Sequence, residues 1–177
     1  MKTLLILRHA KSSWSHTGLS DHDRPLKKRG RRAARRMGEL LVDEGLVPQL
    51  IISSTAKRAR KTAELLTDAC RFDGETRLEG SFYQAGPTAY IRVLQAVSDD
   101  HDRVMVVGHN PGLEILLEVL AGQTAWLPSG SLAQIQLPID AWADLYEYAG
   151  GTLVALWEPK KLPTSGEDGG SAVGAGR

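Results

Sequence analysis

Short, continuous apolar runs recur along the chain, separated by longer amphipathic segments. One run occupies positions 3–7 and a second 50–52, and a third follows Arg103 in the segment 103–107. Runs this short and rich in branched residues are typical of parallel strands that are buried on both faces of a sheet. The pattern therefore predicts three central strands, the second of them closed by the polar pair Ser53 and Ser54.

Apolar residues spaced three or four apart predict four helices between and after these strands. The first helix ends near Gly45, the second covers about 57–70, and Pro111 suits the first turn of the fourth. The positions that carry the pattern are Ala34, Met37 and Leu41; Ala59, Ala63 and Leu66; Tyr90, Leu94 and Val97; and Leu113, Leu116, Leu117 and Leu120.

The remaining segments are predicted as loops and two further strands. A polar loop is expected over about 10–28, and a second loop, containing three glycines, over 74–86. Two later segments, 131–137 and 152–157, have the character of strands that finish the sheet.

Strands and helices thus alternate, which implies a mostly parallel sheet with helices on both faces. The length of 177 residues suits one domain with a sizeable core. We predict a single three-layer α/β domain over residues 1–162. Segment 163–177 consists largely of Gly, Ser, Ala and acidic residues with little to bury, so a disordered tail is expected there.

Charge and composition limit the partners. The chain has 22 basic and 21 acidic residues, a formal net charge of +1, which shows no general preference for nucleic acid. Segment 27–36 is strongly basic, and a solvated helix face is its simplest interpretation. No stretch has the length of a membrane-spanning helix. The single cysteine, Cys70, cannot form a disulfide within the chain. We expect a cytoplasmic monomer with neither a nucleic-acid nor a membrane partner.

Polar residues follow all three central strands at the points where the strands end. Arg8 and His9 close the first strand, the two serines close the second, and His109 follows the third. Ligands of α/β sheets bind beyond the carboxyl ends of the strands. We therefore expect these side chains to meet at one edge of the sheet. Arg58 lies about one turn into the next helix and can point over the same edge.

Two histidines and two arginines in one place predict phosphoryl chemistry. A phosphoryl group in transfer spreads negative charge over three oxygens, which rigid donors can stabilise. Arginine offers a planar fork of donors with a permanent charge. An unprotonated imidazole is a nucleophile near neutral pH. The predicted arrangement is a phosphate site with a nucleophile in it.

Three segments at these positions resemble the signature segments of the histidine phosphatase superfamily. Leu7 to Ser12 resembles the segment of the nucleophile, with Ala10 in place of the usual glycine. Ser53 to Ala63 resembles the segment of the second arginine, and Val107 to Pro111 that of the second histidine. Their order and spacing agree with the superfamily, and the resemblance covers about residues 3–158.

Within the superfamily, the chain is most similar to the small SixA-like phosphohistidine phosphatases. Asp21-His22-Asp23-Arg24-Pro25-Leu26, followed by Arg29-Gly30, resembles the loop before that group's first long helix. The short chain leaves no room for the helical insertions that form a substrate lid in phosphoglycerate mutases and acid phosphatases. The resemblance therefore implies an open site suited to a phosphorylated protein.

The resemblance leaves two candidates for the proton donor. The SixA-like loop offers Asp21, whereas the usual position in larger relatives corresponds to Glu79. Ser15 occupies the place of an asparagine that mutase-like members carry, and Asn110 lies in the segment of the second histidine. We include Ser15 and Asn110 as candidate substrate-binding residues.

These observations together predict a metal-independent phosphatase that forms a phosphohistidine on His9 and removes phosphate from phosphohistidine proteins. Arg8, Arg58 and His109 are expected to bind the phosphate. The two histidines lack a third ligand at metal spacing, so neither a metal nor a cofactor is expected. The alternative is a phosphatase of nucleotides, sugar phosphates or phosphoserine. A phosphate-binding module without turnover is less favoured, as is a nucleic-acid-binding protein that uses the basic segment.

Overall fold

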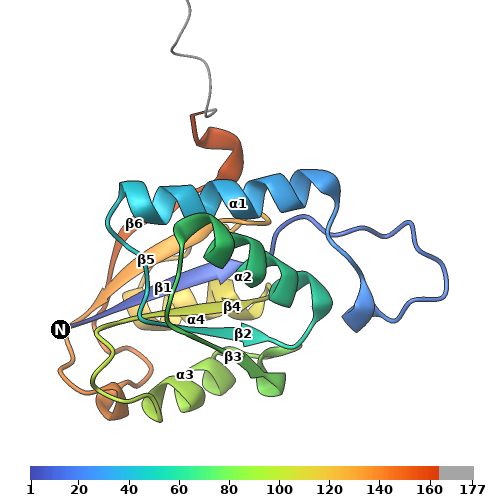
Figure 1. Ribbon diagram of the computed structural model, residues 1–177. Coiled ribbons are helices and arrows are strands. Elements are labelled where there is room, and N and C mark those ends of the chain that lie inside the picture. The colour runs from blue at the N-terminus through green and yellow to red at the C-terminus, as the bar shows by residue number, and fades with distance from the viewer. Residues whose placement is uncertain (164–177) are drawn as a thin grey trace, which may run out of the picture.

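The computed structural model describes residues 1–163, which form a six-stranded sheet covered by helices (Figure 1). The strand order is β3-β2-β4-β1-β5-β6. The bounds are Lys2–Arg8 for β1, Leu50–Ser54 for β2, Glu75–Glu79 for β3, Arg103–Gly108 for β4, Leu132–Leu137 for β5 and Thr152–Trp157 for β6. The first four strands run parallel, whereas β5 and β6 pair in antiparallel fashion. The predicted α/β architecture is confirmed, and residues 164–177 of the expected tail lie outside the described residues.

Each face of the sheet is covered by two helices. The helices α1 (Lys28–Asp43) and α2 (Lys57–Cys70) cover one face, and α3 (Pro87–Gln95) and α4 (Gly112–Ala121) cover the other (Figure 1). All four predicted helices are present. Pro111, however, precedes α4 as its capping residue and does not lie in its first turn.

The central strands are buried because side chains on both of their faces are apolar. Leu4 and Ile6 of β1 pack into the core beneath α3 and α4. Leu5 and Leu7 of the same strand pack into the core beneath α1 and α2. Successive side chains of a strand point to opposite faces, so one apolar run supplies both cores.

The sequence pattern predicted a loop over 74–86. This prediction was wrong, because the segment contains the edge strand β3. β3 pairs with β2 from Glu75, opposite Leu50, to Glu79, opposite Ser54. Its sequence, ETRLE, is mostly polar and mostly exposed. An edge strand has one free side that faces solvent, and charged side chains there discourage pairing with other chains. The hydrophobic pattern therefore cannot reveal it.

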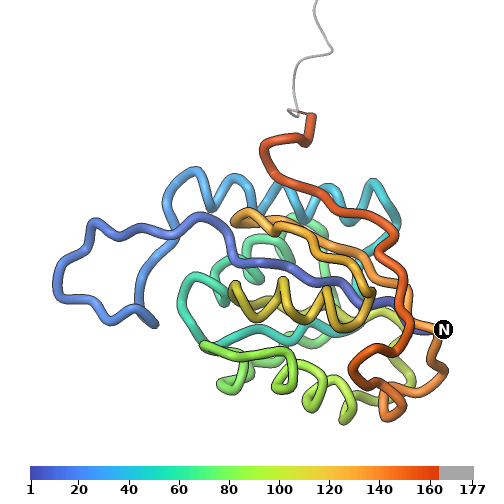
Figure 2. The backbone as a smooth tube through the Cα atoms, turned by 180° about the vertical axis from the view of Figure 1, so that it is seen from behind, coloured from blue at the N-terminus to red at the C-terminus, as the bar shows by residue number. Residues whose placement is uncertain are grey.

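The carboxyl ends of β1, β2 and β4 meet at one end of the sheet. Arg8 pairs with Gly108, and Ser53 pairs with Val107. The loop after β1 extends past this edge, at the end of the molecule opposite the N-terminus (Figure 2). This loop then returns against its own beginning, where the backbone N–H of Lys27 donates to the carbonyl of Lys11 at 2.9 Å.

Gly30 lies where α1 comes closest to the segment that follows β1. A Cβ atom at this position would overlap the backbone carbonyl oxygen of Lys11, two residues after His9. The absence of a side chain at Gly30 therefore lets α1 pack directly against the backbone that holds His9.

We expect Gly30→Ala to lower the free energy of unfolding by about 1–3 kcal/mol, because α1 or the Lys11 backbone must shift to make room. Gly86→Ala is the matched control, since Gly86 also lies at a helix start, with φ of −87° and no atom within 4 Å of an added Cβ. Its effect should stay within about 0.5 kcal/mol. Urea denaturation followed by circular dichroism measures both, and equal effects would show that the close approach does not constrain the fold.

Candidate active site

His9 and His109 lie side by side at the carboxyl ends of β1 and β4. Their ring centroids are 5.1 Å apart, and each residue is only 7% exposed. The two strand ends are joined, because the backbone N–H of His9 donates to the carbonyl of Gly108 at 3.1 Å. The sheet register thus brings together two histidines that are far apart in the sequence.

The ring of His9 is held in one tautomer. Its Nδ1 lies 2.8 Å from the backbone carbonyl oxygen of Ala10, which can only accept a hydrogen bond. Nδ1 therefore carries the proton and Nε2 keeps a lone pair. Burial lowers the pKa of His9 to about 3; the bond to Ala10 opposes this, and the charges of His109, Arg58 and Arg8 add to it. At neutral pH the ring is in its nucleophilic form.

The backbone around His9 is fixed from α2. The N–H of Ala10 donates to the Thr62 hydroxyl at 3.0 Å, and that hydroxyl donates to the carbonyl of Arg58 at 2.7 Å. The φ angle of Ala10 is not positive, so alanine fits where the superfamily usually has glycine. Thr62 thus ties the segment after His9 to the helix that carries Arg58.

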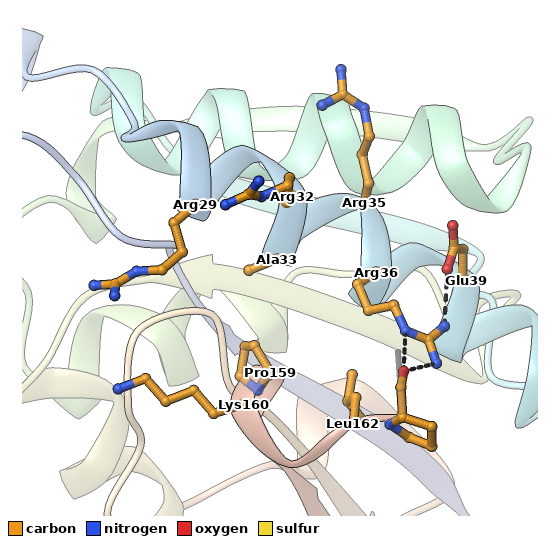
Figure 3. A pocket seen from close by; sticks show the side chains of 10 residues that line it. Arg29, Arg32, Ala33, Arg35, Arg36, Glu39, Pro159, Lys160 and Leu162 are labelled. Carbon is orange, nitrogen blue, oxygen red and sulfur yellow. Dashed lines mark hydrogen bonds and ion pairs between the residues drawn. The ribbon is translucent and has the colours of Figure 1, made fainter. Parts of the chain in front are cut away.

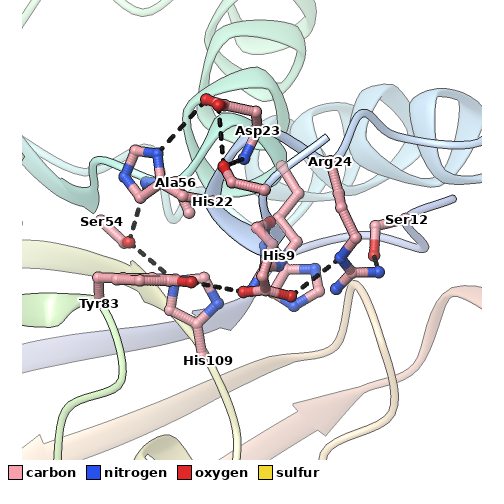
Figure 4. Close-up of polar contacts among 12 residues, drawn as sticks. His9, Ser12, His22, Asp23, Arg24, Ser54, Ala56, Tyr83 and His109 are labelled. Atoms are coloured by element: carbon pink, nitrogen blue, oxygen red, sulfur yellow. Dashed lines mark hydrogen bonds and ion pairs between the residues drawn. The ribbon is translucent and has the colours of Figure 1, made fainter. Parts of the chain in front are cut away.

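The ring of His109 is oriented by Ser54. The Ser54 Oγ accepts from the backbone N–H of Ala56 at 3.2 Å and lies 2.8 Å from Nε2 of His109 (Figure 4). If the Ser54 hydroxyl donates to Nε2, the proton of the neutral ring sits on Nδ1, which is buried and has no partner among residues 1–163. Burial, followed by the positive charge of Arg58, lowers the pKa of His109 to about 4. Nδ1 is then a free donor beside His9.

Both arginines are held by protein oxygens, and each has a buried Nε–H that stays unbonded within residues 1–163. Arg8 donates from Nη1 to the carbonyl of Leu127 at 2.9 Å. Arg58, which is 6% exposed, donates to the carbonyl and the carboxylate of Asp21, at 2.6 and 3.1 Å. The Nε–H groups of both arginines are buried without a partner among the described residues. Buried donors of this kind are normally satisfied, and a phosphate oxygen would satisfy them.

The Asp21 carboxylate is the counter-charge of this cationic site. It accepts hydrogen bonds from the hydroxyl of Tyr83 at 2.6 Å, Nε of Arg24 at 3.0 Å and Nη2 of Arg58. The bond from Tyr83, followed by those from Arg58 and Arg24, lowers the pKa of Asp21 to about 2. A carboxylate that is ionised at neutral pH has no proton to give, so this geometry disfavours Asp21 as the proton donor. It orients Arg58 instead.

Two other predicted residues lie outside this network. Glu79 is at the carboxyl end of β3, and its carboxylate accepts from the backbone N–H and the hydroxyl of Ser81, at 3.1 and 2.8 Å. Ser15 is exposed and shares a hydrogen bond of 2.7 Å with the hydroxyl of Ser13. The roles of Glu79 as proton donor and of Ser15 as a substrate contact stay predictions.

Asn110 has its amide nitrogen committed to protein groups. Nδ2 donates to the Glu114 carboxylate and to the carbonyl of Leu127, both at 2.9 Å. The same carbonyl accepts from Arg8, and Glu114 also accepts the N–H of Leu127. Contact of Asn110 with phosphate stays a prediction, and it would require one of these bonds to break. In this geometry, Asn110 positions the carbonyl that holds Arg8.

Sequence reasoning missed several residues of the site. Thr62 and Arg24 lie inside the segments that carried the family resemblance, but the pattern assigned them no role. Ser54 was expected at this edge of the sheet, but its contact with His109 was not. Tyr83 lies in the segment taken as a loop, and its partner Asp21 is 62 positions away. No local sequence pattern predicts such a contact.

Metal and membrane features are absent from the part of the chain that the structure describes. Within residues 1–163, no three His, Cys, Asp or Glu side chains are grouped so that they could hold a metal ion. In the same range, every helix is too short or too polar to cross a membrane.

Comparisons with known proteins agree on one family. Residues 4–79 match the model of the histidine phosphatase superfamily, branch 1. An uncharacterized chloroplastic protein of Arabidopsis thaliana is 33% identical over 162 residues, which cover 84% of this chain and 72% of that protein.

Two solved structures are similar over almost their whole length, and both are assigned as phosphohistidine phosphatase SixA. That of Agrobacterium tumefaciens is 28% identical with a TM-score of 0.77, covering 89% of this chain and 98% of that one. That of Nakamurella multipartita is 27% identical with a TM-score of 0.79, covering 89% of this chain and 96% of that one.

The two buried neutral histidines predict a fall in stability at mildly acidic pH. Unfolded histidine has a pKa of about 6.5, whereas folding lowers the pKa of His9 to about 3 and of His109 to about 4. Below pH 6.5 the unfolded chain binds protons that the folded chain does not, so the free energy of unfolding falls as pH falls. We expect a loss of about 1–2 kcal/mol per histidine between pH 7 and 5.

Urea denaturation across this range, in phosphate-free buffer, measures the loss. His9→Gln and His109→Gln should each flatten the pH dependence, whereas His16→Gln, which replaces an exposed histidine, should leave it unchanged. A wild-type stability that is constant from pH 7 to 5 would contradict the assignment of neutral buried rings.

Proposed function

This chain belongs to the histidine phosphatase superfamily, and we propose that it hydrolyses phosphohistidine in proteins through a phosphorylated His9. Membership supports phosphatase activity, and the identity of the nucleophile and the substrate is our proposal. The observation that carries it is the buried His9 ring, neutral and with Nε2 unprotonated. Beside it lie the Nε–H groups of Arg8 and Arg58 and the Nδ1 atom of His109, all buried without a partner among residues 1–163.

In the first step, the Nε2 lone pair of His9 attacks phosphorus and the bond from phosphorus to the substrate nitrogen breaks. The leaving imidazole takes the electron pair of that bond. The Nε–H groups of Arg8 and Arg58 and the Nδ1–H of His109 donate to the three equatorial oxygens, where negative charge is concentrated. The hydrogen bond from Nδ1 of His9 to Ala10 stabilises the positive charge that develops on the ring.

In the second step, water attacks phosphorus and the bond to Nε2 of His9 breaks. The electron pair of that bond returns to Nε2, and a proton of the water passes to the solvent or to the released phosphate. The low pKa of His9 helps this step, because a weakly basic imidazole is a good leaving group. The same donors hold the phosphoryl group throughout.

The state of Asp21 supports phosphohistidine as substrate. An alkyl ester needs a proton donor to expel its alkoxide, which typically contributes about 10²- to 10⁴-fold. A phosphohistidine can expel a neutral imidazole when its other ring nitrogen is already protonated. Asp21 is held ionised, so the described site suits the substrate that depends less on an acid. The alternative, a phosphatase of small esters, needs a proton from Glu79 or from water.

The open end of the sheet supports a protein as the partner. The chain spans nearly the full length of two solved structures assigned as phosphohistidine phosphatases, and within residues 1–163 no helical insertion forms a lid. We further propose that the protein acts as a monomer in the cytoplasm, whereas the relative from Arabidopsis thaliana is chloroplastic.

Incubation with phosphohistidine substrate should label His9 with a phosphoryl group that is labile to acid and stable to base. His9→Ala should lower kcat at least about 10³-fold and give no label, because the attacking nitrogen is gone. Acid treatment and mass spectrometry of the labelled peptide identify the site, and His16→Ala serves as the control. A label that persists in His9→Ala, or that resists acid, assigns the nucleophile elsewhere.

Substitution of Asp21 separates its two possible roles. As a residue that positions Arg58, Asp21→Asn should lower kcat/KM by similar factors, about tenfold, for phosphohistidine peptide, p-nitrophenyl phosphate and an alkyl phosphate. Tyr83→Phe, which removes a hydrogen bond to Asp21, should lower all three less but in the same proportion. A loss confined to the alkyl phosphate would instead identify Asp21 as a proton donor, and Glu79→Gln tests the second candidate by the same criterion.

A further inference from the structure

Two neighbouring open cavities extend from Arg8 along α1. The first, about 370 Å³, has Arg8, Lys11 and Trp126 in its lining. The second, about 610 Å³, lies on α1 (Figure 3). Both cavities have Arg29 and Lys160 in their walls, together with Ala33 and Pro159, so they form one continuous depression. We call it the basic groove.

Positive charge is concentrated in the basic groove. Seven of its lining residues are basic and only Glu39 and Glu158 are acidic, although the whole chain has 22 basic and 21 acidic residues. The seven are Arg8, Lys11, Arg29, Arg32, Arg35, Arg36 and Lys160. The groove is therefore a local cationic surface on a nearly neutral protein.

Most of these cations have no counter-charge within the chain. Arg36 pairs with Glu39 at 2.9 Å and also donates to the carbonyl of Pro163. Within residues 1–163, no ion pair is formed by Lys11, Arg29, Arg32, Arg35 or Lys160. Several unpaired cations around one depression are positioned to bind a ligand with several negative charges.

The groove leads directly to the nucleophile. Arg8 precedes His9 in the chain, Lys11 follows it by two residues, and α1 packs on the Lys11 backbone at Gly30. From Arg29 to Arg36, α1 rises about 10 Å, which an extended peptide of three residues spans. Apolar side chains of Ala33, Pro159 and Leu162 lie between the cations and can contact a peptide backbone.

We propose that the basic groove binds an acidic segment of the protein substrate beside its phosphorylated residue. This inference rests on the proposed function, because it assigns the part of the substrate that lies outside the phosphate site. Arginine forks match carboxylates in a bidentate manner, which favours Asp and Glu side chains as ligands. A single-stranded nucleic acid would be held by successive stacking aromatics, and among the residues that line the groove only Trp126 is aromatic.

A binding measurement tests the groove without turnover. The probe is an unphosphorylated fluorescein-labelled peptide with four consecutive Glu residues, compared with the same peptide carrying Gln. Arg32→Glu/Arg35→Glu should weaken binding of the Glu peptide at least about tenfold, and Arg32→Gln/Arg35→Gln should weaken it less. The control, Arg71→Glu/Arg92→Glu, makes the same change in net charge at two exposed arginines outside the groove and should have little effect.

A turnover measurement links the groove to the site. The wild type should hydrolyse a phosphohistidine peptide with Glu flanks with a kcat/KM about tenfold higher than that for the same peptide with Gln flanks. This preference for Glu flanks should disappear in Arg32→Glu/Arg35→Glu. Hydrolysis of p-nitrophenyl phosphate should stay unchanged in that variant, which also shows that it is folded.

Three results would overturn the inference: equal binding of the Glu and Gln peptides, equal loss in the control variant, or binding of an oligonucleotide that depends on Arg32 and Arg35 while the Glu peptide does not bind. Hydrolysis of p-nitrophenyl phosphate without hydrolysis of any phosphohistidine peptide is a different result. It would refute the proposed substrate, and the binding measurement alone would then decide the role of the groove.

Discussion

The register between β1 and β4 is the constraint on which the site depends. Arg8 lies opposite Gly108, and the N–H of His9 bonds to the Gly108 carbonyl, so both histidines leave the sheet at the same level. A slip of one residue would turn each side chain of β1 to the other face. The two separate apolar cores on the faces of the sheet make such a slip costly, because Leu5 and Ile6 would exchange environments. Core packing thus fixes the geometry of the active site.

Burial leaves the histidines neutral at pH 7, whereas the arginines stay charged. Desolvation lowers the pKa of His9 and of His109, so both rings remain neutral beside two cations. An arginine stays charged even when burial lowers its pKa, as it does for Arg8. The site therefore holds permanent positive charge beside neutral imidazole rings, which is the combination that the proposed reaction requires. Asp21, bound to Arg58 from the loop beyond the sheet, balances part of that charge while the site is free.

Outside the site, α1 separates charged side chains from apolar ones. The same helix that packs on the backbone after His9 carries exposed arginines on its outer side. An apolar face of α1 anchors it to α2 and the sheet, through residues such as Met37 and Leu41. One helix thus contacts the core, the segment after His9 and the basic groove, because its period of 3.6 residues presents different faces to each.

The sequence by itself determined the elements that have a strong hydrophobic pattern and the residues at their ends. The apolar runs located the central strands, and the polar residues after them located His9 and His109 at one edge, since parallel strands end together. The helix after the second strand added Arg58. The pattern failed at β3, whose polar residues are held in place by the backbone bonds of β2. It also left Asp21 and Glu79 as two candidates for the proton donor, because a sequence shows a carboxyl group but not the three donors that surround Asp21. Only the tertiary structure decided that Tyr83, Arg24 and Arg58 meet at Asp21 and that Ser54 orients His109. Protonation states depend on burial and on neighbours brought together by folding, and neither is encoded in local spacing.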